Sequence, residues 1–219
     1  RILVEGLGVA HVVVGYDFEF GEGRAGDVAL LQKLGSEMGF AVTSVQPVTG
    51  DAGLYSSTAA RAALAGGRPA EAAGILGHWW ELEGRVEHGQ AKGAKIGFPT
   101  ANLKLSGILS PAPGVYAVRA GIDMGDATSW LKGVANFGTR PTVETGGEMV
   151  FEVHLFDHQG DIYGKHLRVR LIDYLRPEMR FESFDALKAQ IAKDAAQARS
   201  ILDRMPEAPS RPTASSSLR

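Results

Sequence analysis

The residues best suited to bind an anion lie in one glycine- and lysine-rich stretch, GQAKGAKIGFPTAN at residues 89–102. Glycines let backbone N–H groups approach an anion without obstruction by a Cβ atom, and lysines add positive charge beside them. We interpret this stretch as a loop that binds a phosphate chain, although a solvated hairpin connection has the same composition. Its spacing does not match G-x-x-x-x-G-K-[ST], so it is not a P-loop. The residues concerned are Gly89, Lys92, Gly93, Lys95 and Gly97.

Two oxygen-bearing side chains, Thr100 and Asn102, follow this loop at a spacing of two residues. In an extended backbone, residues at that spacing point to the same side, so the hydroxyl and the amide oxygen would lie together. Mg²⁺ prefers oxygen ligands and keeps several waters, so one or two protein oxygens beside a phosphate chain are enough to bind it. The pair therefore predicts a magnesium site next to the bound phosphate.

A carboxylate and an imidazole lie on one face of a predicted strand at residues 149–156. Alternation puts Phe151, Val153 and Leu155 on one face, and Glu152 and His154 on the other among apolar residues. A carboxylate in that setting either pairs with a cation or acts as a general base, and both interpretations stay open. We interpret the histidine as a positioning or packing residue rather than as a base.

Two further polar segments have more than one interpretation. NFGTRPT at residues 136–142 is predicted to be a polar turn that leaves a strand, and it serves either as a tight connection or as a ligand contact. LRPEMRF at residues 175–181 combines aromatic, thioether and guanidinium groups. That mixture suits a flat aromatic ligand, and it equally suits a hydrophobic staple for the helix that follows.

Composition excludes several classes of function. The 219-residue chain is 44% hydrophobic with no cysteine, which excludes disulfides and thiolate metal sites and fits a reducing cytoplasm. The net charge of −2 provides no basic field for nucleic acid. No apolar run is long enough to cross a bilayer, and no signal peptide opens the sequence, so we expect neither a nucleic acid nor a membrane as a partner. The sequence does not fix an oligomeric state.

The first third of the chain is predicted to be an α/β segment. A strand at residues 11–16, expected to be buried on both faces, a helix capped by Asp27 and a strand at residues 40–48 predict a parallel unit. YSSTAAR at residues 55–61 starts a helix, where its hydroxyls and arginine would either bind phosphate or cap the helix. Alanine-rich helices then run to Gly77. Because the chain begins with Arg1 and not with methionine, we interpret it as a processed or truncated product.

The pattern changes to a period of two after Trp79. Strand candidates at residues 80–87, 115–122, 130–137, 148–156 and 167–175 alternate with turn signals, which predicts a small closed antiparallel barrel. A domain boundary is therefore expected near Gly77. An amphipathic helix at residues 183–205, capped by Ser183, should pack against the barrel. The tail at residues 206–219 has little to bury and is expected to be disordered.

Five motifs follow one another along residues 79–204: GxxxGFPTAN at residues 93–102, ANFGTRPT at 135–142, FEVHLF at 151–156, YGK at 163–165 and LRPEMRFESFDALKAQI at 175–191. In this order they resemble the riboflavin kinase module of the bacterial bifunctional riboflavin kinase/FAD synthetase family, and they span nearly all of that range. The segments VVGYDFEFGEGRAGD and YSSTAAR resemble the second half of the same family's adenylyltransferase domain.

The resemblance implies an α+β protein, in which a partial α/β nucleotidyltransferase-like segment precedes a six-stranded antiparallel β-barrel of the riboflavin kinase type with a C-terminal helix. Residues 1–77 would be the C-terminal half of an FMN adenylyltransferase domain, residues 78–205 the riboflavin kinase domain and residues 206–219 a disordered tail. The implied reaction is phosphorylation of the riboflavin 5′-hydroxyl with MgATP, which yields FMN and ADP.

The resemblance also implies roles for particular residues. Glu152 would be the catalytic base, and Thr100 and Asn102 would bind Mg²⁺ and phosphate. The remaining residues would contact the two substrates: Gly89, Gly93, Lys95 and His154 on the ATP side, and Arg176, Glu178 and Phe181 on the flavin side.

The family's adenylyltransferase half normally begins with a glycine-rich strand and an HxGH-type motif, and residues 1–219 contain neither. A half site lacks the groups that stabilise an adenylyl transition state, so we expect no FAD synthesis from this chain as given. Two alternatives to a riboflavin kinase stay open: part of a bifunctional FAD synthetase whose other half is supplied elsewhere, and a non-catalytic flavin or nucleotide binder. Nucleic-acid binding by the barrel is the weakest option.

Overall fold

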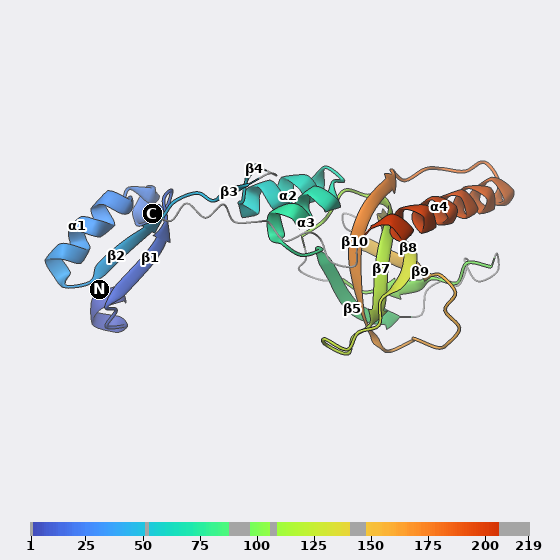
Figure 1. Ribbon diagram of the computed structural model, residues 1–219, viewed down its shortest axis with the longest axis horizontal. Helices are drawn as coiled ribbons and strands as arrows, with labels where there is room; N and C mark the ends of the chain where they lie inside the picture. The colour runs from blue at the N-terminus through green and yellow to red at the C-terminus, as the bar shows by residue number, and fades with distance from the viewer. Residues whose placement is uncertain (1, 51–52, 88–96, 106–108, 141–147, 206–219) are drawn as a thin grey trace. The chain divides into compact units, whose positions relative to one another are not determined.

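The computed structural model describes residues 2–50, 53–87, 97–105, 109–140 and 148–205 (Figure 1). Its contacts divide the chain into two compact units, Arg1–Tyr55 and Ser56–Arg219, called here the N-terminal unit and the barrel unit. Most of the predicted phosphate loop and the whole predicted tail lie outside the described residues. The domain boundary near Gly77 stays a prediction, because a division by contacts does not test where family domains end.

The N-terminal unit is built around one β-α-β segment, as the sequence predicts. Strands β1 (His11–Gly15) and β2 (Ala41–Val45) pair in parallel, and helix α1 (Val28–Met38) connects them. Asp27 caps this helix by accepting a 2.8 Å hydrogen bond from the backbone N–H of Leu30. Its other elements are the π-helix Ile2–Gly6, the 3₁₀ turn Glu22–Arg24 and the short strands β3 (Thr49–Gly50) and β4 (Gly53–Leu54).

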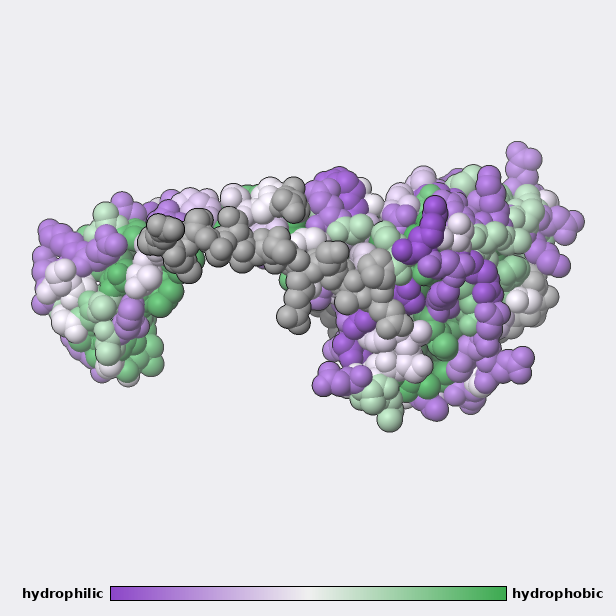
Figure 2. Space-filling view, in the orientation of Figure 1, coloured by the Kyte–Doolittle hydropathy of each residue, from purple (hydrophilic) through white to green (hydrophobic). Residues whose placement is uncertain are grey.

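The prediction that the first strand is buried on both faces is wrong for the described chain. Val14 is 9% exposed and packs with Leu31 and Phe40, whereas Val13 is 63% exposed. The reason is that a two-stranded sheet with one helix covers only one of its faces. Figure 2 shows apolar side chains on the surface of this unit.

The barrel unit opens with two short helices, α2 (Ser57–Ala65) and α3 (Pro69–Leu76). The hydroxyl of Ser56 accepts a 3.1 Å hydrogen bond from the N–H of Ala59, so the capping interpretation of this segment is confirmed. The apolar residues of these helices pack together and against Trp80. Among the described residues, no helix is both long enough and apolar enough to cross a bilayer.

Six antiparallel strands close into a barrel, which confirms the predicted fold class. Around the barrel the order is β10, β5, β6, β9, β8, β7, and it returns to β10. The predicted strand at residues 130–137 continues to Arg140, so NFGT lies within a strand and is not a turn. The bounds are β5 (Glu81–Glu87), β6 (Ala101–Leu103), β7 (Gly114–Ile122), β8 (Leu131–Arg140), β9 (Glu148–Leu155) and β10 (His166–Arg176).

Alternating side chains fill the inside of the barrel. Phe151 and Val153 of β9, and Ala101 and Leu103 of β6, are all 5% exposed or less and belong to one core cluster. The residues between them on the same strands must therefore point outward. Hence Glu152 and Asn102 lie on the outer face of the barrel.

Helix α4 (Phe184–Arg204) covers part of that outer face (Figure 1). The hydroxyl of Ser183 caps it by accepting a 3.1 Å hydrogen bond from the N–H of Ala186. The C-terminal half of α4 packs Ala195, Ala198 and Leu202 against outward-facing residues of β7, β8 and β10 in a second core cluster. Under this half of α4, the outer face of the barrel is therefore shielded from water as well as the inside of the barrel is.

Arg119 of β7 secures the C-terminal end of α4. Its side chain is buried, and its guanidinium donates to the backbone carbonyls of Leu202, at 3.0 Å, and Met205, at 2.9 Å. The last carbonyls of a helix lack hydrogen-bond donors within the helix and carry partial negative charge. A guanidinium there supplies the missing donors and neutralises that charge.

Replacing this arginine should destabilise the barrel unit. We expect Arg119→Met to lower its free energy of unfolding by about 2–3 kcal/mol, because two hydrogen bonds from a charged donor are lost. Urea denaturation followed by tryptophan fluorescence measures this. The matched control is Arg204→Met, an exposed arginine of the same helix that donates to the carbonyl of Ser200, with an expected loss below about 1 kcal/mol. Equal losses in both variants would contradict the capping role.

Candidate functional site

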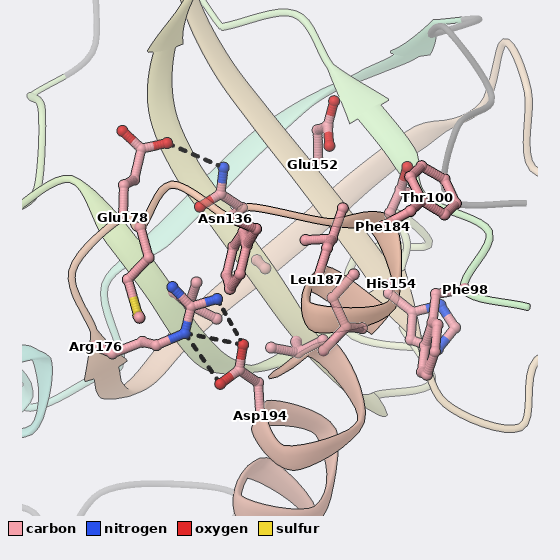
Figure 3. A pocket seen from close by; sticks show the side chains of 16 residues that line it. Phe98, Thr100, Asn136, Glu152, His154, Arg176, Glu178, Phe184, Leu187 and Asp194 are labelled. Carbon is pink, nitrogen blue, oxygen red and sulfur yellow. Dashed lines mark hydrogen bonds and ion pairs between the residues drawn. The ribbon is translucent and has the colours of Figure 1, made fainter. Parts of the chain in front are cut away.

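A cavity of about 370 Å³ lies on the outer face of the barrel beside the N-terminal half of α4 (Figure 3). Its volume lies within the usual range for small-molecule sites. One part of its wall is apolar and comes from β7, β8 and α4. The lining residues used below are Val115, Val134, Leu187 and Ile191 on the apolar wall, and Thr100, Asn136, Glu152, His154, Arg176, Glu178 and Phe181 around it.

Glu152 lies in register between the two asparagines of the chain. On β6, Asn102 pairs directly with Glu152, and on β8, Asn136 pairs directly with Glu152 from the other side. Directly opposite residues on one face of an antiparallel sheet have Cβ atoms about 5 Å apart. The carboxylate therefore has a carboxamide on each side, on the outer face of three adjacent strands.

Thr100 lies where two cavities adjoin, because it lines both of them. The second cavity has a volume of about 560 Å³ and lies at one end of the barrel, where Val153 and Leu155 reach it from inside. The loop between β9 and β10 forms its other wall through His158, Gly160, Asp161, Ile162 and Tyr163. Two ligands that exchange a group could therefore approach Thr100 from two sides.

His154 ties β9 to the segment before β6. Its Nδ1 lies 2.8 Å from the carbonyl oxygen of Pro99, and since a carbonyl only accepts, Nδ1 carries the proton. The imidazole also makes edge contacts with Phe98 and Phe156, at centroid distances of 5.3 and 5.7 Å. These contacts agree with the positioning role inferred from the sequence.

A buried ion pair holds the opposite side of the first cavity. The guanidinium of Arg176 donates to both carboxylate oxygens of Asp194, with Nη2 at 2.7 Å and Nε at 3.0 Å. The side chains are 15% and 5% exposed. Gln190 adds a 2.7 Å hydrogen bond to the same carboxylate. The pair therefore fixes the end of β10 to α4 at the start of the 177–183 segment.

Glu178 and Phe181 belong to that 177–183 segment and line the same cavity. The carboxylate of Glu178 accepts a 3.3 Å hydrogen bond from Nδ2 of Asn136 (Figure 3). The guanidinium carbon of Arg176 lies 5.8 Å from the ring centre of Phe181. Burial raises the pKa of the nearby Tyr174, with Arg176 opposing that rise and Glu178 adding to it.

A second ion pair, which is exposed, links α4 to the end of β9. Arg199 donates to both oxygens of Asp157, at 2.7 and 3.0 Å, and these hydrogen bonds lower the pKa of that carboxyl. The guanidinium also lies over the ring of Phe156, 4.2 Å from its centre. Helix α4 is therefore linked to two of the strands that border the cavity, β9 and β10.

The structure brings most of the predicted site residues to one cavity. Thr100, Glu152, His154, Arg176, Glu178 and Phe181 all line it, and Asn102 lies beside Glu152 in register. Figure 3 shows Glu178 and Arg176 on one side of the cavity and Glu152, Thr100 and His154 on the other. The predicted loop residues Gly89, Gly93 and Lys95 lie outside the described residues.

Sequence reasoning missed Asp194 and treated Asn136 as part of a turn. A signal for Asp194 was present, because it stands three residues after Ile191 and four before Ala198, on the apolar stripe of the helix. A carboxylate on a buried stripe requires a cation, and Arg176 supplies it. The alternation along β8 gave no comparable signal for Asn136, because the role of Asn136 depends on Glu152, which lies opposite it on β9.

One group of possible metal ligands lies away from the cavities. Ligand atoms of Glu83, Asp123 and His166 lie within 4.8 Å of one another, but all three residues are exposed. Arg168 lies 3.8 Å from the carboxylate of Asp123. None of these residues lines either cavity. We interpret the group as a surface ion-pair network.

Comparisons with known proteins give both family matches and similar relatives. Residues 76–202 match the family model described as riboflavin kinase, and residues 1–59 match the model described as FAD synthetase. The chain is 50% identical over 198 residues to the bifunctional riboflavin kinase/FMN adenylyltransferase of Escherichia coli (strain K12), covering 90% of this chain and 62% of that protein. The Pseudomonas fluorescens protein of the same name is 46% identical over 201 residues, covering 92% and 63%.

A solved structure is also similar over most of the chain. It is described as a macrolide-efflux protein from Streptococcus pneumoniae and is 32% identical, with a TM-score of 0.76, covering 93% of this chain and 63% of that one. The chain thus spans less than two thirds of the length of these relatives.

Breaking the buried pair should destabilise the barrel unit more than breaking an exposed one. We expect Asp194→Ala to lower the free energy of unfolding by about 3 kcal/mol, because it leaves the Arg176 charge buried without a partner. The matched control is Asp203→Ala on the same helix, whose exposed carboxylate pairs with Lys132. Its expected loss is below about 1 kcal/mol. Urea denaturation measures both, and a small loss for Asp194→Ala would show that the pair does not hold the segment.

Proposed function

The chain belongs to the riboflavin kinase family, and we propose that its barrel unit transfers the terminal phosphate of ATP to the 5′-hydroxyl of riboflavin, yielding FMN and ADP. The observation that carries this proposal is the position of Glu152, which lines the first cavity beside Thr100 and lies in register with Asn102. Phosphoryl transfer requires mainly positioning, charge neutralisation and one group that takes the hydroxyl proton. The cavity provides residues for each part.

Flavin binding is assigned to the first cavity. Its apolar wall, formed by Val115, Val134, Leu187 and Ile191, suits a flat aromatic ring and excludes water from it. Phe181 and Glu178 lie at its edge. The role of Arg176 differs from the one that the resemblance implies, because its guanidinium is already engaged by Asp194. We infer that Arg176 supports the flavin side by fixing the 177–183 segment.

Nucleotide binding is assigned to the second cavity and to the predicted phosphate loop that precedes Thr100. Because Thr100 lines both cavities, a phosphate chain that extends from the second cavity would reach the flavin hydroxyl in the first. Gly89, Gly93 and Lys95 retain their predicted contacts with ATP as part of this proposal. His154, held by the carbonyl of Pro99, lies next to the same threonine segment.

The residues that would hold Mg²⁺ are Thr100 and Asn102. They fit this cation, because both offer neutral oxygens, Asn102 on the outer face of β6 and Thr100 just before that strand, and the adjacent Glu152 adds negative charge. Bound there, Mg²⁺ would neutralise charge on the phosphate chain. The two side chains orient that chain, and Glu152 accepts the proton of the 5′-hydroxyl as its oxygen bonds to the terminal phosphorus and the bond to ADP breaks.

A second candidate activity is adenylylation of FMN to FAD. It is favoured by the match of residues 1–59 to the FAD synthetase model and by the names of the relatives. We assign it only to a protein that also contains the HxGH-type motif, and we expect none from residues 1–219 alone. Both activities would use ATP, and the absence of cysteine fits a reducing compartment, so we propose a cytoplasmic location.

Replacing the proposed base should abolish most turnover without loss of nucleotide binding. We expect Glu152→Gln to lower kcat by about 10²- to 10⁴-fold, the usual contribution of a general base. An assay of FMN formation from riboflavin, ATP and Mg²⁺ measures kcat, and titration with ADP and Mg²⁺ measures binding. Unchanged turnover would remove Glu152 from the mechanism, and absence of FMN formation by the unaltered chain would refute the kinase proposal.

Replacing Asn102 should weaken binding only when the metal is present. We expect Asn102→Ala to reduce affinity for ADP in the presence of Mg²⁺ by about 10-fold or more, since even residues that only orient a metal ligand contribute about that much. Without Mg²⁺ the variant and the unaltered chain should bind ADP equally. Calorimetric titrations with and without the metal test this, and equal losses under both conditions would argue against metal coordination.

A further inference from the structure

Asn136 lies between two carboxylates that line the same cavity. It pairs in register with Glu152 on the neighbouring strand, and its Nδ2 donates to Oε1 of Glu178 at 3.3 Å. All three residues line the first cavity, and Figure 3 shows the carboxamide between the two acidic side chains. We propose that Asn136 is a positioning residue for riboflavin, which it serves by holding the carboxylate of Glu178 at the flavin side.

The position calls for a neutral side chain that donates a hydrogen bond. An acidic residue there would repel both neighbouring carboxylates, and a basic residue would pair with Glu152 and compete for the group that is proposed to accept the proton. A carboxamide carries no charge and has two N–H donors, so it can hold one carboxylate while it lies beside the other. Glu178 is exposed, so without this bond its long side chain would occupy many rotamers.

Gly138 provides a second observation on the same Glu178 carboxylate. It lies two residues beyond Asn136 on β8 and therefore on the same face of the strand. A Cβ atom at this glycine would lie only 2.1 Å from Oε1 of Glu178. The φ angle of Gly138 is not positive, so space rather than backbone conformation is what the position requires. Strand β8 thus provides both the donor and the room for the Glu178 carboxylate.

The segment that contains Glu178 then has two attachments. The buried pair between Arg176 and Asp194 fixes its start, and the hydrogen bond from Asn136 fixes the carboxylate two residues later. The first attachment is buried, whereas the second is long and exposed. We therefore assign to Asn136 the position of one side chain and not the stability of the barrel.

The inference rests on the proposed function and predicts a change in KM for riboflavin rather than in kcat. For Asn136→Ala we expect riboflavin KM and Kd to rise about 5- to 10-fold, just below the range for a hydrogen bond to a charged group, because this bond is long and exposed. The kcat value should stay within about 2-fold, and KM for ATP should not change. Steady-state FMN formation by the full chain and quenching of riboflavin fluorescence measure these constants.

The chain offers a matched control, because Asn102 is its only other asparagine and pairs with Glu152 from the opposite side. Asn102→Ala should change the metal-dependent binding of nucleotide and leave riboflavin Kd within about 2-fold. Gly138→Ala should raise riboflavin Kd as Asn136→Ala does, since it displaces the same carboxylate. Circular dichroism and thermal unfolding establish that each variant is folded.

Double variants test whether Asn136 acts through Glu178. In a Glu178→Ala background, Asn136→Ala should raise riboflavin Kd no further. Asn136→Asp should weaken binding more than Asn136→Ala, because two carboxylates would then face each other. Adding Glu178→Gln to Asn136→Asp restores a donor and an acceptor in reversed order and removes the repulsion between positions 136 and 178. The double variant should therefore bind riboflavin more tightly than Asn136→Asp alone, while the carboxylate at position 136 still faces Glu152.

Three results would overturn the inference while leaving the kinase proposal intact. They are an unchanged riboflavin Kd in Asn136→Ala, a lower kcat with unchanged riboflavin KM, and full additivity with Glu178→Ala. If the unaltered chain neither binds nor phosphorylates riboflavin, the proposed function itself fails, and this outcome is recognised before any variant is measured.

Discussion

The proposed site depends on one constraint: side chains alternate along each strand, and the inside of the barrel is already filled by apolar ones. Phe151 and Val153 are at most 1% exposed inside the barrel, so Glu152, which lies between them, must face outward. Moving this strand by one residue would place a carboxylate in the apolar core, at a cost that no partner there could offset. The same packing that stabilises the barrel thus fixes the direction of Glu152, and it fixes Asn102 on β6 in the same way.

Closure of the barrel brings these outward-facing side chains close to one another. Because β6, β9 and β8 are neighbours, their outward residues Asn102, Glu152 and Asn136 form a row. Helix α4 then separates this outer face into two regions. Its C-terminal half packs directly on the barrel with Ala195, Ala198 and Leu202, whereas its N-terminal half borders a cavity. A site on an outer barrel face would otherwise be open to water, and the helix supplies the missing wall.

Three arginines of this unit link helix α4 to the barrel and do not form a site of their own. Arg119 binds the last carbonyls of α4, Arg199 pairs with Asp157 at the end of β9, and Arg176 pairs with Asp194 at the end of β10. The pair between Arg176 and Asp194 changes the role that the resemblance implies for Arg176. We infer that Arg176, which the resemblance assigns to the flavin side, acts indirectly through the segment that it fixes, and that Asn136 also acts indirectly.

The sequence alone determined the fold class, most strand and helix bounds and the placement of Glu152 on the strand face opposite Phe151 and Val153, because these depend on short-range periodicity and caps. It did not determine that NFGT continues a strand, that Asp194 engages Arg176, or that the first strand has an exposed face. Each of these depends on what lies opposite a residue in space. Both asparagines of the chain flank Glu152 only because barrel closure sets the register between strands that are distant in sequence, and a period of two specifies a face but not a neighbour.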